Sequence, residues 1–421
     1  MNEVLPEPIL EALATQVAVD AALYNGRLAA APALAILFQV CSTWREVSHS
    51  DLLWQRLTRR IWRRSYLMRT TWHHEFIYWH RTARNFETGN PTSNVPLFDP
   101  SEQRRGMICR SMAISERHLA CGFVDGTVRL FDLETSAHVS TYVSAYGNIM
   151  GAFSLSVLGI AMVNSVIAFA RIDGNVYVDF INGPGPINAR RAVIGDVVNN
   201  GVLVGFAGTA RWWVGLYAGN PGQAFHIWDA RSEEPVFVGG TLTDPESVMG
   251  WHMLSELVEP VGRVRVVDRE FVVACTGSKL VCFNFRNPEV LLFDLEPATG
   301  FVVASLDSCQ EKFVVVERNG VGTVRRAGSF ERLSRFRLRG SVRGLCGCMN
   351  TGYVLTYSSG PGPGPGPLLR VFHIEPAVGR LCVTLGVGAE EANSMVANER
   401  HVAISGHAGF INLLDFGVQD P

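Results

Sequence analysis

The chain has 421 residues, of which 47% are hydrophobic and only 18% are charged. A sequence of this length and composition has enough apolar side chains for a large folded core, which excludes a disordered protein. Its formal net charge is −2 at pH 7, so it lacks the overall positive charge of a dedicated nucleic-acid-binding protein.

No part of the sequence predicts secretion or a membrane span. The first residues are acidic and lack the basic and apolar stretches of a secretory signal, so we expect the protein to stay inside the cell. Residues 151–170 are uncharged, but serine and asparagine split them into two pieces of strand length. The nine cysteines include no C-x-x-C pair and lie mostly in apolar runs, which predicts buried thiols in a reducing compartment.

The first ninety residues predict helices. They contain five tryptophans and few glycines, and their apolar residues recur every three or four positions. The first helix should begin at Pro6 and Glu7, because proline and an acidic side chain both suit a helix N-terminus. Residues 86–100 are rich in Asn, Pro, Thr and Ser, which predicts a boundary.

From about Gly106 the sequence consists of short apolar strands separated by Gly, Asp or Asn turns. This pattern recurs in seven copies, spaced by 42 to 55 residues, as expected for the four-stranded blades of a propeller. The last copy ends on its third strand at Phe416, and residues 93–99 could supply the missing outer strand. The equivalent positions in the copies are Phe131, Asp179, Trp228, Phe283, Arg325, Phe372 and Leu414.

The repeat resembles the WD repeat of β-propellers. Ile227-Trp228-Asp229 keeps the Trp-Asp ending and Phe131-Asp132 approximates it, whereas the opening Gly-His is absent. Residues 360–367 alternate glycine and proline, so they predict an exposed loop between two strands of the sixth copy.

The helical part resembles an F-box, whose pattern is Leu-Pro, two apolar helical pairs, an apolar-Cys-x-x-Trp helix and a closing Leu-Trp. Here the pattern occurs as LPEPIL, LFQVCSTW and SDLLWQRL, with a connection over residues 14–32 that is longer than usual. The resemblance implies docking to the Skp-type adaptor of a cullin-RING ubiquitin ligase. The residues that it assigns to adaptor binding are Leu5, Pro6, Ile9, Leu10, Leu37, Val40, Cys41, Trp44, Leu53 and Trp54.

We therefore expect an all-α F-box domain (1–60), a helical linker (61–90), a connecting segment with a possible closing strand (91–105) and an all-β seven-bladed WD-repeat-like propeller (106–421). A small helical module cannot bury all of its apolar surface and needs a partner. The combination predicts a non-catalytic receptor that brings a protein substrate close to a charged ubiquitin carrier, with the helices between Leu53 and Arg84 as the spacer.

Over its whole length the chain resembles a family of plant regulators that join an F-box to a propeller. The resemblance implies a protein that acts in flower and organ growth and removes transcriptional repressors of the PEAPOD type. It implies a nuclear location, and a cytoplasmic location is left open as well. Our candidates for substrate contacts are large or charged residues near predicted strand ends: Arg171, Trp212, Trp251 and Arg343.

Two arginine-rich stretches leave alternatives open. Residues 56–69 hold six arginines and no acid, which could be an import or phosphate-binding patch, although the solvated face of an amphipathic helix is favoured. A DNA-associated regulator that uses this stretch is the alternative function. The second stretch, residues 325–343, could meet an acidic substrate segment or be an exposed outer strand.

No motif predicts catalysis, a metal site or a cofactor. The sequence has no nucleophile elbow, phosphate loop or dinucleotide fingerprint. His73, His74 and His80 lack a Cys or carboxylate at ligand spacing, so we expect them on a helix surface or in packing.

Overall fold

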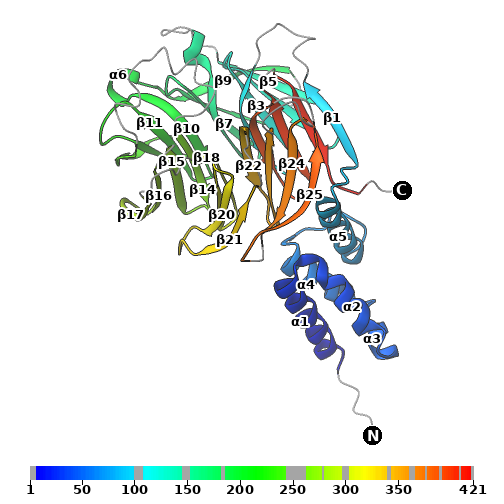
Figure 1. The fold of residues 1–421 in the computed structure, drawn as a ribbon. Helices are drawn as coiled ribbons and strands as arrows, with labels where there is room; N and C mark the ends of the chain where they lie inside the picture. The colour runs from blue at the N-terminus through cyan, green and yellow to red at the C-terminus, as the bar shows by residue number, and fades with distance from the viewer. Residues whose placement is uncertain are drawn as a thin grey trace. The chain divides into compact units, whose positions relative to one another are not determined.

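The computed structural model describes residues 6–98, 108–144, 152–181, 185–242, 262–276, 279–295, 303–338, 343–359, 366–374, 377–387, 391–406 and 409–418. The chain divides into two compact units, residues 1–93 with 415–421, and residues 94–414. The first is helical and the second consists mostly of strands (Figure 1). The predicted combination of an N-terminal helical segment with a β-propeller-like fold is confirmed.

The helical unit begins as the sequence predicts, with Pro6 capping the first helix and Pro8 in its first turn. Most of the long connection over residues 14–32 extends this helix, because its alanines are strong helix formers. Gly26, at a φ of 90°, lies just beyond the end of that helix. The helices are α1 (Glu7–Asn25), α2 (Ala30–Phe38), α3 (Ser42–Val47), α4 (Asp51–Ile61) and α5 (Trp72–Thr88), with a 3-10 turn at Arg27–Ala29.

The strand-rich unit contains five four-stranded sheets and one eight-stranded sheet. Four of the four-stranded sheets are antiparallel, with their strands in chain order. They consist of β10 (Val202–Gly208), β11 (Trp212–Ala218), β12 (Phe225–Asp229) and β13 (Pro235–Gly239); β14 (Gly262–Val267), β15 (Phe271–Thr276), β16 (Leu280–Asn284) and β17 (Asn287–Leu295); β18 (Val303–Cys309), β19 (Lys312–Glu317), β20 (Val321–Arg326) and β21 (Arg332–Arg337); and β22 (Arg343–Met349), β23 (Tyr353–Ser359), β24 (Leu368–His373) and β25 (Arg380–Gly386).

The eight-stranded sheet joins two four-stranded sets through a parallel pair, in which residues 140–144 of β5 lie beside residues 185–189 of β9. Two short helical segments accompany the sheets, a 3-10 turn at Ala152–Leu155 and α6 (Val197–Asn200). The strands of this sheet are β2 (Cys109–Ile114), β3 (His118–Phe123), β4 (Val128–Asp132), β5 (His138–Ser144), β6 (Val157–Val163), β7 (Val166–Arg171), β8 (Val176–Phe180) and β9 (Gly185–Val193).

The remaining sheet combines strands from distant parts of the chain. Its order is β1 (Ser93–Phe98), β28 (Ile411–Asp415), β27 (His401–Gly406) and β26 (Ala392–Ala397). The segment that the sequence offers as an outer strand thus lies beside the last strand and covers its edge. The first strands of the sets contact one another in the cyclic order β2, β6, β10, β14, β18, β22, β26 and again β2.

The repeat alignment assigns equivalent residues to equivalent places. Its marker residues lie on the third strands β4, β8, β12, β16, β20, β24 and β28. The aspartates that follow two of them, Asp132 and Asp229, each accept backbone N–H groups of the next turn through one carboxylate oxygen. The Trp-Asp ending therefore has a physical role here, because the aspartate fixes the turn into the outer strand.

Two further expectations concern runs of special composition. Residues 157–163 and 166–171 of the uncharged run form β6 and β7, and in the part of the chain that the structure describes no helix is long and apolar enough to cross a membrane. The glycine-proline run falls between β23 and β24, but its residues 360–365 lie outside the described residues.

Neighbouring first strands approach each other closely where glycine occurs. A Cβ added to Gly159 on β6 would overlap the carbonyl oxygen of Phe206 on β10. On the second strand β3, a Cβ added to Gly122 would lie 2.6 Å from Cγ1 of Val157 on β6. Gly159 accepts only glycine, because its obstacle is backbone that cannot turn aside.

We expect Gly159→Ala to lower the free energy of unfolding by about 1–3 kcal/mol, since the added methyl group overpacks the contact between β6 and β10. Urea-induced unfolding of the full chain measures this. The control is Gly386→Ala, because a Cβ there meets nothing within 4 Å. Equal stability of the two variants would contradict the close approach of the two strands.

Candidate functional site

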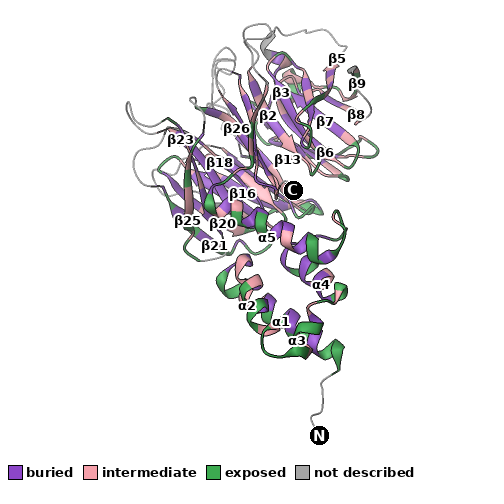
Figure 2. Cartoon of the chain, turned by 90° about the vertical axis from the view of Figure 1, so that its right-hand side faces the viewer, coloured by how far each residue is buried: buried purple, intermediate pink, exposed green. Residues whose placement is uncertain are grey.

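Helix α1 carries an exposed apolar face. Ile9, Leu13 and Val17 are 46%, 45% and 40% exposed, and their spacing of four places them on the same side of the helix. Figure 2 shows exposed stretches alternating with buried ones along α1. The opposite side is buried and consists mainly of alanines, at positions 14, 18 and 22. Three large apolar side chains thus lie in water while alanines form much of the buried side, so the exposed side is a candidate interaction surface. We call Ile9, Leu13 and Val17 the α1 stripe.

The end of α2 and the turn after it add further apolar surface. Ile36 is 70% exposed and Val40 66% exposed. Of the residues that the sequence assigns to adaptor binding, Pro6, Ile9, Val40 and Cys41 are exposed and Leu37 and Trp44 are half-buried. Leu5 lies outside the described residues.

Three of the assigned residues belong to the core of the helical unit instead. Leu10, Leu53 and Trp54 are buried, so a docking partner cannot reach most of their surface. The Trp54 ring packs 5.1 Å from that of Phe76, and its Nε1 donates a hydrogen bond to the carbonyl oxygen of Ser48 at 2.7 Å. These residues hold α4 in place and support the exposed surface rather than form it.

Buried carboxylates join the helices to one another. Glu11 on α1 accepts a hydrogen bond from the hydroxyl of Ser50, which is the N-cap residue of α4. Glu11 also forms an ion pair with Arg56 at 3.1 Å. Glu75 on α5 accepts the Trp79 indole N–H at 2.7 Å and two backbone N–H groups, those of residues 68 and 69, at 3.1 and 3.0 Å. With their acceptors satisfied, these networks fix the helices and so present the α1 stripe in one arrangement.

The arginines of residues 56–69 pack on aromatic rings. The guanidinium group of Arg64 lies 3.9 Å from the centre of the Trp79 ring, and that of Arg69 lies 4.2 Å from the Tyr78 ring. The guanidinium group of Arg59 lies 5.7 Å from the centre of the Trp72 ring, and Arg59, Arg60 and Arg63 are all exposed. This packing supports the interpretation of the stretch as one side of an amphipathic helix and its continuation.

Two of the substrate-contact candidates on the propeller, Arg171 and Trp212, have described side chains, and both contact other residues of the propeller. Arg171 is buried, donates to Asp173 at 2.5 Å and to Ser144 at 2.8 Å, and so fixes a turn instead of meeting a ligand. Trp212 is half-buried and stacks on Phe285 with ring centres 5.6 Å apart. Trp251 lies outside the described residues, and Arg343 begins β22 but its side chain is not among those described.

The second arginine-rich stretch lies at the outer edge of one sheet. Arg325 donates to the carbonyl oxygen of Phe330 at 3.0 Å, and Arg326 pairs with Glu331 at 2.9 Å. Arg332, Arg335 and Arg337 are exposed on β21, the outermost strand. Arg339 lies outside the described residues. The described part thus corresponds to the expected exposed outer strand.

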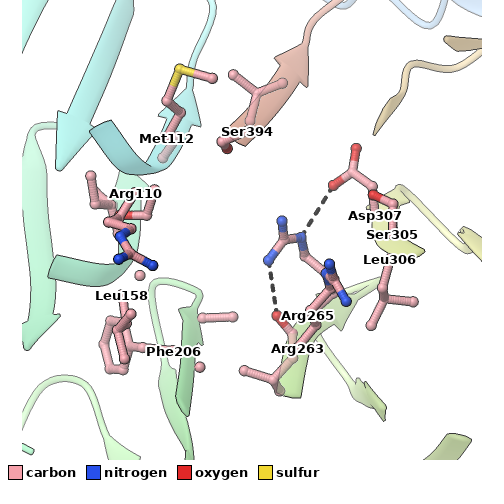
Figure 3. Close-up of a pocket in the computed structure, with 18 of the residues that line it drawn as sticks. Arg110, Met112, Leu158, Phe206, Arg263, Arg265, Ser305, Leu306, Asp307 and Ser394 are labelled. Atoms are coloured by element: carbon pink, nitrogen blue, oxygen red, sulfur yellow. Dashed lines mark hydrogen bonds and ion pairs between the residues drawn. The ribbon is translucent and has the colours of Figure 1, made fainter. Parts of the chain in front are cut away.

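A cavity of about 380 Å³ lies between the first strands β2, β6, β10, β14, β18, β22 and β26 (Figure 3). Among the described residues that line it, the basic ones are Arg110, Arg263 and Arg265 and the acidic one is Asp307. Sequence reasoning missed these arginines. Arg110 and Arg263 are both the second residue of a first strand, where other copies carry Leu158, Ala304 or Asn393. Extending the repeat alignment to that strand would have singled them out.

Within this cavity the side chains of Arg265 and Asp307 form an ion pair. Arg265 Nε donates to Asp307 Oδ1 at 3.2 Å, and Asp307 Oδ2 accepts the backbone N–H of Met349 at 2.9 Å. Burial raises the pKa of Asp307, and the neighbouring Arg265 opposes that rise. Burial also lowers the pKa of Arg263, and the positive charge of Arg265 lowers it further.

The comparisons with known proteins agree with the architecture. No protein-family model matches the sequence. The transcriptional regulator STERILE APETALA of Arabidopsis thaliana is 45% identical over 424 residues, which cover 99% of this chain and 93% of that protein.

Solved propellers share the fold. U3-55K covers 77% of this chain and 100% of its own, with a TM-score of 0.58 and 10% identity. The WD40 repeats of RRP9 cover 77% of this chain and 98% of their own, with a TM-score of 0.55 and 10% identity. At such low identity the likeness shows the fold alone, a WD40 propeller.

We expect Arg64→Lys to lower the free energy of unfolding of the helical unit by about 1 kcal/mol, because an ammonium group cannot stack on the Trp79 ring as a guanidinium group does. The helical circular-dichroism signal during urea titration measures this. Arg60→Lys is the matched control, since Arg60 is exposed. A loss of the same size in both variants would contradict a packing role for Arg64.

Proposed function

The chain belongs to the family of the transcriptional regulator STERILE APETALA, and from this premise we propose that it is the substrate-recruiting subunit of an SCF-type cullin-RING ubiquitin ligase. In this proposal the helical unit is an F-box that docks a Skp-type adaptor. The propeller, with seven blades, holds the protein substrate. The observation that carries the proposal is the exposed α1 stripe.

Two properties of the α1 stripe favour docking to a protein: its side chains are large and apolar, and the helix that carries them is held in place by the helical unit. Burial of apolar surface contributes roughly 25 cal/mol per Å², and a few large side chains usually dominate an interface. Ile9, Leu13 and Val17 are such side chains, and the carboxylate of Glu11 behind them is already satisfied within the unit. A partner therefore meets a preorganised surface and loses little conformational entropy on binding.

The propeller supports the receptor half of the proposal. Seven blades would require seven four-stranded sets whose first strands contact one another in a ring. The five four-stranded sheets and the two sets joined in the eight-stranded sheet fit this requirement, as do the cyclic contacts of the first strands. Its role is proximity, because a bound substrate lysine stays near the ubiquitin carrier while this chain itself catalyses nothing. By kinship with a transcriptional regulator, we propose a nuclear site of action and a repressor of the PEAPOD type as the substrate, in plant flower and organ growth.

A DNA-associated regulator is the second candidate, favoured by the relative's description as a transcriptional regulator and by the exposed Arg60 and Arg63. It predicts duplex binding that weakens steeply with salt and is lost when both arginines become glutamine. The ligase proposal predicts no such binding. Fluorescence anisotropy with a labelled DNA duplex at two salt concentrations separates the two.

We expect the double change Ile9→Ser with Leu13→Ser to reduce co-purification of a Skp-type adaptor with the full chain at least tenfold. Both side chains are exposed, so the change removes apolar contact area without disturbing the core. Pull-down of a co-expressed adaptor, followed by quantitative mass spectrometry, gives the measurement.

The matched control is Met68→Ser, which removes an apolar side chain that is 62% exposed in the same helical unit but lies outside α1 and α2. It should retain the adaptor. If the double variant retained the adaptor as fully as this control, docking through the α1 stripe would be wrong.

A further inference from the structure

We propose that the exposed arginines of β21 bind an extended acidic segment of another protein. The site consists of Arg332, Arg335 and Arg337, which we call the β21 arginine row, with the apolar side chain of Val378 beside Arg335. The identity of the bound protein as a ligase substrate rests on the proposed function. Binding through the arginine row itself needs no adaptor and no ligase.

The strand register places the arginine row on one side of its sheet. Paired residues of neighbouring strands point the same way, and alternate residues of one strand share a side. The partners of the row on β20 are alternate residues: Arg337 pairs with Val321, Arg335 with Thr323 and Arg332 with Arg325. The opposite side of β21 carries Ser334 and Phe336, which are buried. The three arginines therefore extend from the same side and can reach one ligand.

A β-bulge brings the third arginine to this side. Arg332 and Arg335 are three residues apart, so simple alternation would place them on opposite sides of the strand. The register shifts beside Arg325, which leaves Leu333 as an extra residue and pairs Arg332 with Arg325. Burial lowers the pKa of Arg325, and the positive charge of Arg332 lowers it further, as expected for two neighbours on the same side.

The arginine row carries positive charge that its surroundings do not neutralise. Residues 321–337 contain five arginines and one acid, Glu331. This acid pairs with Arg326 at 2.9 Å, and Arg325 donates to the carbonyl oxygen of Phe330 at 3.0 Å. In the part of the chain that the structure describes, no carboxylate pairs with an arginine of the row. Three positive charges on one strand attract a partner with negative charges.

The backbone edge of β21 is already in use beside Arg335. The N–H of Arg335 donates to the carbonyl oxygen of Ala377 at 3.1 Å, and its carbonyl oxygen accepts the N–H of Gly379 at 2.8 Å. This parallel bridge pairs Arg335 with Val378, whose side chain is 77% exposed. A partner strand therefore cannot add to the sheet at Arg335. It meets the side chains of the arginine row and of Val378 instead.

An extended acidic segment fits the spacing of the row. Residues two apart in a strand lie about 7 Å from each other on the same side, and this applies both to Arg335 and Arg337 and to alternate carboxylates of an extended peptide. Each guanidinium group offers a planar pair of donors to one carboxylate. A nucleic-acid backbone matches the charge but has no apolar side chain to cover Val378, so a protein segment is favoured.

The test is fluorescence anisotropy of the full chain at constant ionic strength. The probe is a short labelled peptide that alternates glutamate with valine. Two further probes are the same peptide with lysine in place of glutamate and a single-stranded DNA with the net charge of the acidic peptide. We expect saturable binding of one acidic peptide per chain, weakened about tenfold or more in the triple variant Arg332→Gln, Arg335→Gln and Arg337→Gln. The lysine peptide should not bind.

The matched control is a second triple variant, Arg117→Gln, Arg211→Gln and Arg231→Gln. It changes the net charge equally but removes exposed arginines from turns of other sheets, so it should bind the acidic peptide as the original chain does. All three side chains of the arginine row are exposed, so the unfolding temperature of the first variant should be unchanged and its weaker binding does not reflect unfolding.

Three results would overturn the proposal. They are absence of saturable binding of the acidic peptide, an equal loss of binding in the two triple variants, and DNA binding as tight as that of the peptide. The last result would identify the row as a nucleic-acid contact. Because the assay contains no adaptor, none of these results bears on whether the α1 stripe docks one.

Discussion

The packing of the alanine face of α1 against α2 and α4 determines what the helical unit can offer a partner. Small residues at positions 14, 18 and 22 let the helices approach, and the large side chains of Ile9, Leu13 and Val17 are left on the opposite side. Glu11 reinforces this choice, because its ion pair with Arg56 and its bond from Ser50 hold the same face of α1 inward. The exposed stripe is thus a consequence of the unit's own core and not of a missing part of it.

In the propeller, a comparable constraint acts between the first strands. Glycines such as Gly159 allow neighbouring backbones to meet, and Ser111 and Ser305 each link a first strand to its neighbour by a hydrogen bond. The contacts between first strands follow a closed cycle, and β1 covers the edge of β28. The cavity is therefore bordered by first strands that contact their neighbours all the way round.

Much of the fold follows from the sequence because its signals are periodic. Alternation of apolar residues, turn residues and the Asp after Trp228 place the strands and their order, since each signal depends only on local chemistry. The burial of Leu10 on α1 does not follow from it. An apolar spacing shows that a helix has a buried side, but α1 is apolar on both sides, and only the packed structure shows which side is inward.

The candidate site on the propeller was harder to predict for a related reason. Arg171 is large and charged and lies near a strand end, yet a local pair with Asp173 buries it. Arg110 lines the cavity at a register shift between β2 and β3, which strand alternation does not reveal. Charge and position along the chain therefore identify candidate residues, while local pairing and backbone register decide which of them face the cavity.

The central claim is that the α1 stripe is an open surface that another protein covers. Site-specific photocrosslinking tests it most directly, with a photoreactive amino acid in place of Leu13 on the stripe, in cells that contain the ligase components. The account predicts a covalent product with a Skp-type adaptor from this position. Crosslinks formed only within the chain itself would contradict it, because the stripe would then be covered by the protein's own fold.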